Sequence, residues 1–408
     1  MTKKNISFFM GSGFSVPAGY PKMQEIDLAI CYSTGAFIVE HDLNSKIRTK
    51  DYLFYFNIIN KYLDFCSQRI SIYKNKKIDL NYEIVYYEIN RLFRIMKDGS
   101  DLLSDPILNE LQTILSVHSK EFEKIDYFKH VLDSYCHNIS KNVLLSLMSK
   151  SPTNLNKYDG FNSFIKRLSK FNIINSYCTT NYDLLIETLL SEQGLKYHEN
   201  FRKLLKGDLP KLCKGRNMIK LYDSKMNFAQ EAPKLLKLHG SIDNFLLSED
   251  IGAPEFQKGH TIKSPNQYEF KQELGVNSTF KTSDAPEILI GTKNKLEEYH
   301  QFYYSRTFNK FLQCLDETHI LIIIGYGFGD YGINQAFWNW LSNNEPAKMF
   351  IIDISNSLAD FVKSKHNPKL FRHYNSIKRG KKLLYFKGGV ENADYEQIFA
   401  RINEIIRR

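Results

Sequence analysis

Short apolar runs, each followed by glycine or polar residues, recur near the N-terminus and through the last two-thirds of the chain. Such runs are typical of strands buried in a parallel sheet. They fall at Ile6–Met10, Ile173–Cys178, Leu235–Leu238, Glu287–Gly291, His319–Ile324, Met349–Ile354 and Leu383–Phe386, the last as an edge strand. Apolar residues spaced three or four apart predict helices at Phe161–Lys170, Asp183–Leu190, Leu296–Leu315, Asn334–Leu341 and Glu396–Arg408. We therefore expect an α/β fold with a Rossmann-like parallel sheet.

The pattern is different between residues 25 and 158. Apolar and aromatic residues recur there at helical spacing, as in the segments DYLFYFNIINKYLDFCSQRI and YEIVYYEINRLFRIM, with loops near residues 74–77 and 97–105. We predict a large helical insertion over 25–158 that follows the first glycine-rich loop. The sheet domain then comprises 1–24 and 159–408, and residues 356–408 form a basic C-terminal extension that ends in a closing helix.

Composition and cysteine spacing narrow the class of protein. Of the 408 residues, 43% are hydrophobic and 25% charged, and the longest apolar run, Ile320–Ile324, is far shorter than the roughly 18 residues that span a bilayer. The six cysteines are scattered singly, without a CxxC pair. This spacing argues against a zinc ribbon and a disulfide framework and suits a reducing compartment. We expect a cytoplasmic protein that uses no metal and does not enter a membrane.

The net charge of +10 is unevenly distributed. Residues 356–408 hold 12 Lys and Arg against 5 Asp and Glu, and the stretch Lys196–Lys220 is also basic. These residues form either a solvated basic face or a docking surface for nucleic acid or an acidic partner subunit. The sequence has no aromatic-interleaved motif that would support base recognition.

Four short motifs carry the candidate chemistry: GSGFSVPAGYP at Gly11–Pro21, TTNYD at Thr179–Asp183, LHGSID at Leu238–Asp243 and GYGFGD at Gly325–Asp330. Each begins at the end of a predicted strand. The carboxyl ends of parallel strands meet at one edge of a sheet, where α/β proteins bind their ligands. The four motifs together therefore predict a dinucleotide site at that edge. The polar segment Ser241–Pro286 predicts a long loop or hairpin region over it.

The first motif predicts a phosphate-binding loop. Glycine lets the backbone turn sharply and approach a ligand, and exposed amides at the start of a helix receive phosphate. Two glycines after a strand are also consistent with an ordinary tight turn. The candidate cofactor-binding residues here are Gly11, Ser12, Gly13, Ser15, Gly19 and Pro21.

The second and third motifs supply the candidate catalytic groups. Asn181 is predicted to hold a ribose or a water, with Thr180 and Asp183 beside it, although Thr, Asn and Asp also commonly cap helices. His239 lies between an apolar strand and a glycine-serine turn, where an imidazole is suited to act as a general base. The alternative for His239 is a structural role.

The last motif predicts the rest of the nucleotide site. Gly325, Gly327 and Gly329 alternate, which lets the backbone lie flat against a ribose or an adenine. Asp330 either caps the following helix or bonds a ribose hydroxyl. Asp353 ends a further strand and is suited to an adenosine ribose, with an ordinary turn residue as the alternative.

These motifs, in this order, resemble the sirtuin-like NAD-binding family over about residues 5–24 and 160–355. The resemblance implies that Gly11–Ser15, Gly19 and Pro21 bind the dinucleotide phosphates. Asn181, Asp183 and His239 would line the nicotinamide-ribose pocket, and Gly325–Asp330 would complete the site. Two features of the deacylase branch are missing: no cysteine lies between His239 and Cys314, and Pro21 is not followed by an aromatic-arginine pair.

The motifs TTNYD and GYGFGD resemble those of bacterial sirtuin-like domains that hydrolyse NAD⁺ in antiphage defence. The resemblance implies NAD as the substrate, no metal, a homo-oligomer and a partner subunit such as a HerA-type ATPase. Our leading hypothesis is an NAD⁺ glycohydrolase in which Asn181 orients the ribose or water and His239 acts as base. The alternatives are an NAD-dependent protein deacylase and a non-catalytic sensor of NAD or ADP-ribose.

Overall fold

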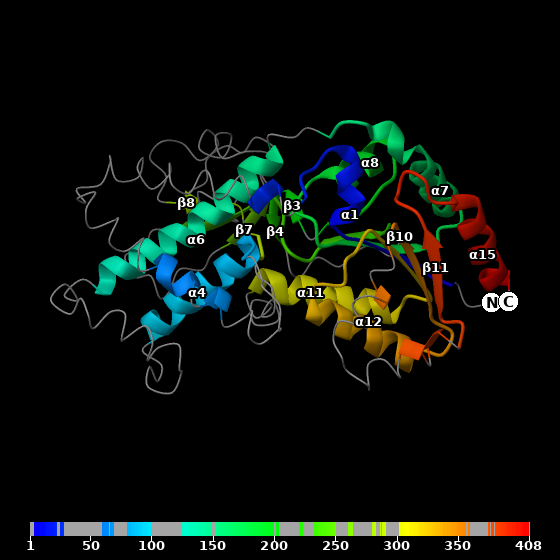
Figure 1. Ribbon diagram of the computed structural model, residues 1–408. Coiled ribbons are helices and arrows are strands. Elements are labelled where there is room, and N and C mark those ends of the chain that lie inside the picture. The colour runs from blue at the N-terminus through cyan, green and yellow to red at the C-terminus, as the bar shows by residue number, and fades with distance from the viewer. Residues whose placement is uncertain are drawn as a thin grey trace. The chain divides into compact units, whose positions relative to one another are not determined.

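The computed structural model describes most of the predicted sheet domain and part of the predicted insertion (Figure 1). The described residues are 4–22, 25–27, 59–64, 66–68, 80–98, 125–148, 152–199, 201–203, 220–222, 232–249, 260–263, 280–282, 286, 288–290, 302–355, 358–359, 374–375, 377–378 and 380–407. The predicted loop at 74–77 and most of that at 97–105 lie outside these ranges.

A six-stranded, fully parallel sheet forms the centre of the fold. Its order is β11-β10-β9-β1-β2-β5. The strands are β1 (Ile6–Met10), β2 (Ile174–Thr179), β5 (Lys234–Lys237), β9 (Ile320–Ile324), β10 (Lys348–Asp353) and β11 (Leu383–Lys387). The chain builds outward from β1 to β2 and β5, then returns to the other side of β1 at β9. This order confirms the Rossmann-like α/β fold, with β11 at an edge as predicted.

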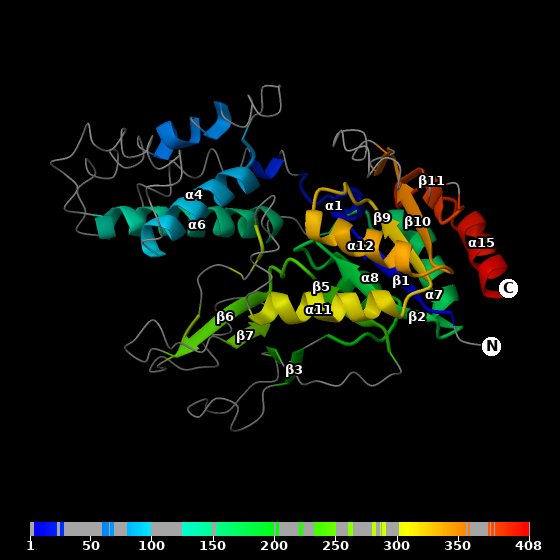
Figure 2. The same ribbon diagram turned by 90° about the horizontal axis from the view of Figure 1, so that it is seen from below.

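Helices cover both faces of the sheet because neighbouring side chains on a strand point to opposite faces. On β1, Phe8 packs against Phe161 and Phe164 of α7 (Asp159–Ser169), with ring centroids 6.1 Å apart in both cases. Phe9 packs on the opposite face against Phe311 and Phe337. These belong to α11 (Phe302–Asp316) and α12 (Tyr331–Asn343), which lie side by side in Figure 2.

Two further helices complete the layers. The helix α15 (Tyr395–Arg407) packs beside α7, and α8 (Leu185–Glu192) follows the second strand. Arg167 of α7 pairs with Glu396 of α15 at 2.8 Å and lies over the ring of Phe399. The closing helix is thus held against the same face as Phe8, as Figure 1 also shows.

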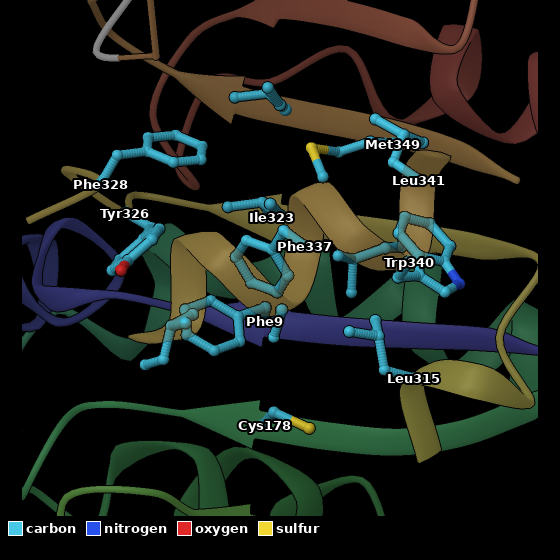
Figure 3. Close-up of a cluster of buried hydrophobic side chains, with 14 of the residues drawn as sticks. Phe9, Cys178, Leu315, Ile323, Tyr326, Phe328, Phe337, Trp340, Leu341 and Met349 are labelled. Carbon is cyan, nitrogen blue, oxygen red and sulfur yellow. The ribbon is translucent and has the colours of Figure 1, made fainter. Parts of the chain in front are cut away.

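Figure 3 shows a cluster of buried hydrophobic side chains on the Phe9 face of the sheet. Phe337 from α12 lies between Phe9 and Ile323, and Trp340 lies farther along the same helix, near Leu341 and Leu315. The Trp340 ring nitrogen donates a hydrogen bond to the carbonyl of Thr318, so the one polar atom of this side chain is satisfied inside the core. Full burial of aromatic side chains of this kind contributes about 1.5–3 kcal/mol each.

A second sheet takes three of its strands from Ser241–Pro286, the segment predicted as a long loop or hairpin region. It contains five antiparallel strands in the order β3-β4-β7-β6-β8. They are β3 (Phe201–Lys203), β4 (Lys220–Tyr222), β6 (Asn244–Glu249), β7 (His260–Lys263) and β8 (Phe280–Thr282). Of the two alternatives for Ser241–Pro286, the structure shows the hairpin region, because β6 pairs antiparallel with β7 and with β8. The sheet that these strands form with β3 and β4 was not predicted, because the strands are short and their apolar residues sit among many polar ones. Ile288, in the predicted strand Glu287–Gly291, makes only an isolated bridge to Gly240.

The chain divides into two compact units. One comprises Met1–Tyr20, Leu147–Leu289 and Lys293–Arg408, and holds both sheets. The other comprises Pro21–Ser146 and Ile290–Thr292, and its described elements include α4 (Tyr82–Asp98) and most of α6 (Ile125–Met148). The predicted boundaries at 24/25 and 158/159 stay a prediction. None of the helices in the described ranges has the length and apolar character needed to cross a membrane.

Candidate functional site

The carboxyl ends of five adjacent strands place the candidate residues along one edge of the parallel sheet. In spatial order the strands are β10, β9, β1, β2 and β5. Asp353 ends β10, the Gly325 loop follows β9, the Gly11 loop follows β1, Thr180 follows β2, and His239 lies just after β5. β2 and β5 are added on one side of β1, and β9, β10 and β11 on the other. The order of the strands therefore switches between β1 and β9, and open α/β sheets bind ligands at the carboxyl edge beside such a switch point.

The loops after β1 and β9 touch through their glycine backbones. The Gly13 amide donates to the Gly325 carbonyl at 2.9 Å, and the Gly11 amide donates to the Ile324 carbonyl at 3.0 Å. A Cβ on Gly325 would lie 2.5 Å from the carbonyl carbon of Gly13, and Gly325 also has a φ of +60°. These three glycines are therefore required by the contact between the two loops.

The remaining part of the second glycine loop is open. Gly327 and Gly329 are exposed, and a Cβ on either would meet no heavy atom within 4 Å. Ser12 and Gly13 are also exposed, at the start of the short helix α1 (Ser12–Ser15). The space that the sequence interpretation assigned to a ligand thus lies beside Gly327 and Gly329, while Gly325 fixes the loop.

Asn181 connects the end of β2 to the first glycine loop. Its side-chain amide donates to the Gly11 carbonyl at 2.8 Å and to the Ser15 hydroxyl oxygen at 2.9 Å. Its backbone amide donates to the Thr179 hydroxyl oxygen at 3.0 Å. Both protons of the side-chain amide are used within the protein, so the orientation of the Asn181 carbonyl oxygen is fixed.

His239 pairs with Asp330 across the strand ends. Its Nε2 lies 3.0 Å from Oδ2 of Asp330, and both side chains are at least 95% buried. Asp330 also caps α12, since its Oδ1 accepts from the Ile333 amide at 3.1 Å. With the proton on Nε2, the imidazole donates to this carboxylate, which fixes the orientation of the ring. A carboxylate that orients an imidazole is the arrangement of a general base with its orienting partner.

Tyr326 stabilises the same turn. Its hydroxyl accepts from the Asp330 amide at 3.3 Å and lies 3.3 Å from the side-chain oxygen of Asn334. Burial, and then the nearby Asp330 carboxylate, hold the pKa of the Tyr326 hydroxyl well above its usual value. The phenol therefore stays protonated and acts as a hydrogen-bond donor that shapes the turn.

The other predicted residues have partners within the protein. Asp183 accepts from the Leu185 amide at 3.0 Å and so stabilises the turn that leads into α8, whose N-cap residue is Leu184. Asp353 accepts from the Ser355 amide at 3.4 Å. Gly19 ends a short helix with a φ of +89°. Thr180 donates its backbone amide to Met10, and Pro21 is the first residue of the second compact unit.

A buried group of charges lies behind the strand end, and the sequence interpretation missed it. The Lys237 ammonium is 3.0 Å from Glu187, and Lys263 is 2.5 Å from Glu199 and 3.3 Å from Asp243. The three carboxylates hold the pKa of Lys263 well above its usual value, although burial alone would lower it. Lysine within the otherwise apolar run LLKL was the signal for this group in the sequence, because charged residues are rarely buried without partners.

The described residues offer no metal site. Within the described ranges, no group of three or more His, Cys, Asp and Glu side chains is arranged to hold a metal ion. The polar groups that the structure describes at this edge of the sheet are an amide, an imidazole paired with a carboxylate, and backbone groups of two glycine loops.

Comparison with known proteins agrees with this arrangement. Residues 175–377 match the family model of the SIR2-like domain. The matched range includes Asn181, His239 and Asp330, while the Gly11 loop lies outside it. This part of the chain is thus similar to SIR2-like domains. A search of the curated proteins found no match.

Sirtuin structures are also similar to the chain, at low scores. A structure from work on the mechanism and regulation of Sir2 enzymes is 10% identical, covers 100% of this chain and 93% of its own, and has a TM-score of 0.38. Sir2Tm bound to a propionylated peptide is 9% identical with coverages of 98% and 93% and a TM-score of 0.38. A complex of Sir2 with a p53 peptide and NAD⁺ is 11% identical with coverages of 98% and 92% and a TM-score of 0.36. We base the fold assignment on the sheet topology.

Proposed function

We propose that the protein is an NAD⁺ glycohydrolase that cleaves the bond between nicotinamide and ribose to give nicotinamide and ADP-ribose. The observation that carries the proposal is the pairing of His239 with Asp330, at 3.0 Å, on the same sheet edge as the Asn181 amide. Nicotinamide leaves as a neutral molecule, so the transition state resembles an oxocarbenium ion. Such a reaction needs an oriented ribose, a positioned water and a base, and needs no metal.

Each group has a defined part in this reaction. The fixed carbonyl oxygen of Asn181 accepts a hydrogen bond from a ribose hydroxyl or from the attacking water. The His239 imidazole takes the proton from that water as the water oxygen bonds to the anomeric carbon and nicotinamide leaves, and Asp330 stabilises the imidazolium that results. The open backbone beside Gly327 and Gly329 offers space for the adenosine part of NAD⁺.

Some of the candidate binding residues keep the roles that the family resemblance implies. We propose that Ser12, Gly13 and Ser15 face the phosphates, with Gly19 and Pro21 shaping the end of that loop. Thr180, Asp183 and Asp353 would shape the pocket walls mainly through the turns they stabilise. Water competes with an acylated protein for the same intermediate, and the lack of cysteines between His239 and Cys314 favours water.

The test is release of nicotinamide from NAD⁺ by the purified protein, with and without an acetyl-lysine peptide. Asn181→Ala and His239→Ala should each lower the rate by about 10²–10⁴-fold, the usual contribution of general acid-base groups. Asn175→Ala and His319→Ala are matched controls, because Asn175 lies at the start of β2 and His319 just before β9, away from the carboxyl edge. Release that depends on the peptide would favour a deacylase instead, and full activity in both site variants would contradict the proposal.

We further propose that NAD⁺ cleavage serves antiphage defence by depleting cellular NAD⁺, in a homo-oligomer that works with a partner subunit such as a HerA-type ATPase. The support is the resemblance of TTNYD and GYGFGD to such effectors, together with the basic residues of 356–408 as a surface for an acidic partner. Infected cells that express the wild type should lose NAD⁺, and cells that express His239→Ala should keep it. Light scattering of the purified protein measures the oligomeric state.

A further inference from the structure

Lys237 is a buried lysine directly behind the Asn181 turn. It occupies the last position of β5, and its side chain is only 6% exposed. The ammonium donates to the backbone carbonyls of Asp183 and Tyr182, the latter at 3.4 Å, and to Oε1 of Glu187 at 3.0 Å. An ammonium group has three protons, so these three acceptors use all of them.

The contacts of Lys237 fix the second half of the turn, which is Tyr182 and Asp183. The first half, Thr180 and Asn181, is fixed by hydrogen bonds to β1 and to the loop that follows it. The Asn181 amide bonds Gly11 and Ser15, and the Thr180 amide bonds Met10. Tyr182 and Asp183 point their carbonyls away from that loop toward β5, where Lys237 receives them. The turn is thus clamped from both sides, with Asn181 between the two sets of hydrogen bonds.

The lysine is itself held by the buried charges behind it. Glu187 lies on α8 immediately after the turn, and its Oε1 is 3.0 Å from Lys237 and 3.9 Å from Lys263 of β7. Lys263 in turn contacts Glu199 and Asp243. The Glu187 carboxylate on α8 therefore holds the Lys237 ammonium in place beside the turn.

We infer that Lys237 is a positioning residue, whose ammonium holds the Tyr182–Asp183 backbone so that the Asn181 side chain keeps its orientation at the edge of the sheet. The lysine does not touch the reacting atoms. Its effect on NAD⁺ cleavage rests on the proposed function, whereas its effect on the turn does not.

The first test therefore needs no activity. Hydrogen exchange of the full-length protein is followed by mass spectrometry for peptides that cover residues 178–186. Lys237→Met keeps the length of the side chain and removes its donors, and it should speed exchange in these peptides by at least about fivefold through local opening. Lys234→Met is the matched control: Lys234 lies on the same strand and pairs with Glu317 at 3.5 Å, and its loss should leave these peptides unchanged.

The second test separates positioning from stability. In the nicotinamide assay, Lys237→Met should lower kcat by about 10–100-fold, with KM for NAD⁺ changed less than about threefold, because the misplacement affects the reacting geometry. Lys237→Gln, which keeps two N–H donors at shorter reach, should fall between the wild type and Lys237→Met in both tests. A wild type without NAD⁺ cleavage would sink the proposed function and leave the exchange result to decide the inference.

Three outcomes would overturn the inference. One is a folded Lys237→Met whose turn exchanges like the wild type. Another is faster exchange of equal size in Lys234→Met. The third is failure of both Lys237 variants to fold, which would assign the lysine to the stability of the sheet as a whole.

Discussion

The interiors of the parallel strands and the turns that follow them are both buried, but they are built from different chemistry. Phe8, Phe9 and the run Ile320–Ile324 are almost completely buried and apolar. Two to six residues beyond the ends of their strands, Asn181, His239 and Asp330 are 4–9% exposed and polar, and each has a hydrogen-bonding partner that follows a different strand. The interiors provide stability, and the turns hold a small number of oriented polar groups. Substitutions in the two regions should therefore change different measurements.

The largest expected effect on stability comes from a strand interior. Phe9→Ala removes a fully buried ring from between α11 and α12 and should lower the free energy of unfolding by about 3–5 kcal/mol. The rate of nicotinamide release per folded molecule should stay close to that of the wild type. Urea unfolding combined with active-site titration checks both. A large loss of rate in the folded fraction would show that the two regions are not separable.

A substitution at the strand ends should instead lower the rate of nicotinamide release and leave stability almost unchanged. Asp330→Asn keeps an N-cap for α12 but presents an amide to His239, which reverses the hydrogen bond and favours the wrong tautomer. We expect a decrease in kcat of about 10²–10³-fold, with the free energy of unfolding changed by less than about 1 kcal/mol. Steady-state kinetics and urea unfolding of the same preparation measure the two quantities. Loss of stability without loss of rate would mean that Asp330 only caps the helix.

The two glycine positions of the last loop separate the roles more finely. Gly325→Ala adds a Cβ 2.5 Å from Gly13 at a φ of +60° and should cost about 2–4 kcal/mol through strain and displaced backbone. Gly327→Ala enters open space and should change stability by less than about 0.5 kcal/mol. It should raise KM for NAD⁺ if that space takes the nucleotide. An unchanged KM in Gly327→Ala would place the nucleotide elsewhere.

The smallest effect concerns the charges behind the turn and depends on pH. Burial raises the pKa of Glu187 despite its neighbouring lysines, so the folded protein binds this proton more tightly than the unfolded chain does. The stability that this bound proton contributes to the folded protein is fully present below the ordinary pKa of 4.5, and it is lost as the pH rises through the raised pKa of Glu187. Glu187→Gln should therefore gain stability relative to the wild type between acidic and neutral pH. Urea unfolding of both proteins at several pH values measures this difference, and a difference in the free energy of unfolding that stays constant with pH would contradict the prediction.

Much of the sheet was predictable because short apolar strands followed by glycine are a strong local signal. Ile6–Met10 was predicted with the bounds that the structure shows. Each end of β2, β9, β10 and β11 lies within one residue of its predicted position. The second sheet was missed, since its strands pair antiparallel across long segments and carry mixed residues. Pairing of that kind depends on distant partners, which no local pattern reveals.

The residues of the site were predictable by type, but their partners were not. His239 and Asp330 are 91 positions apart and meet only because β5 and β9 end at one edge of the sheet. The sequence interpretation considered a cap or a ribose contact for Asp330, and the structure shows the cap together with the histidine. Similarly, Gly325 was expected to face a ligand, yet it packs on Gly13. Contacts between loops depend on strand order, which local motifs do not specify.

The most direct test compares nicotinamide release by the wild type, His239→Ala, Asp330→Asn and the double variant under identical conditions. If Asp330 acts through His239, the double variant should be no slower than His239→Ala by more than about threefold, because residues that work as a unit are not additive. Losses that multiply in the double variant would show two independent roles. A wild type that releases no nicotinamide from NAD⁺ would contradict the proposed activity itself.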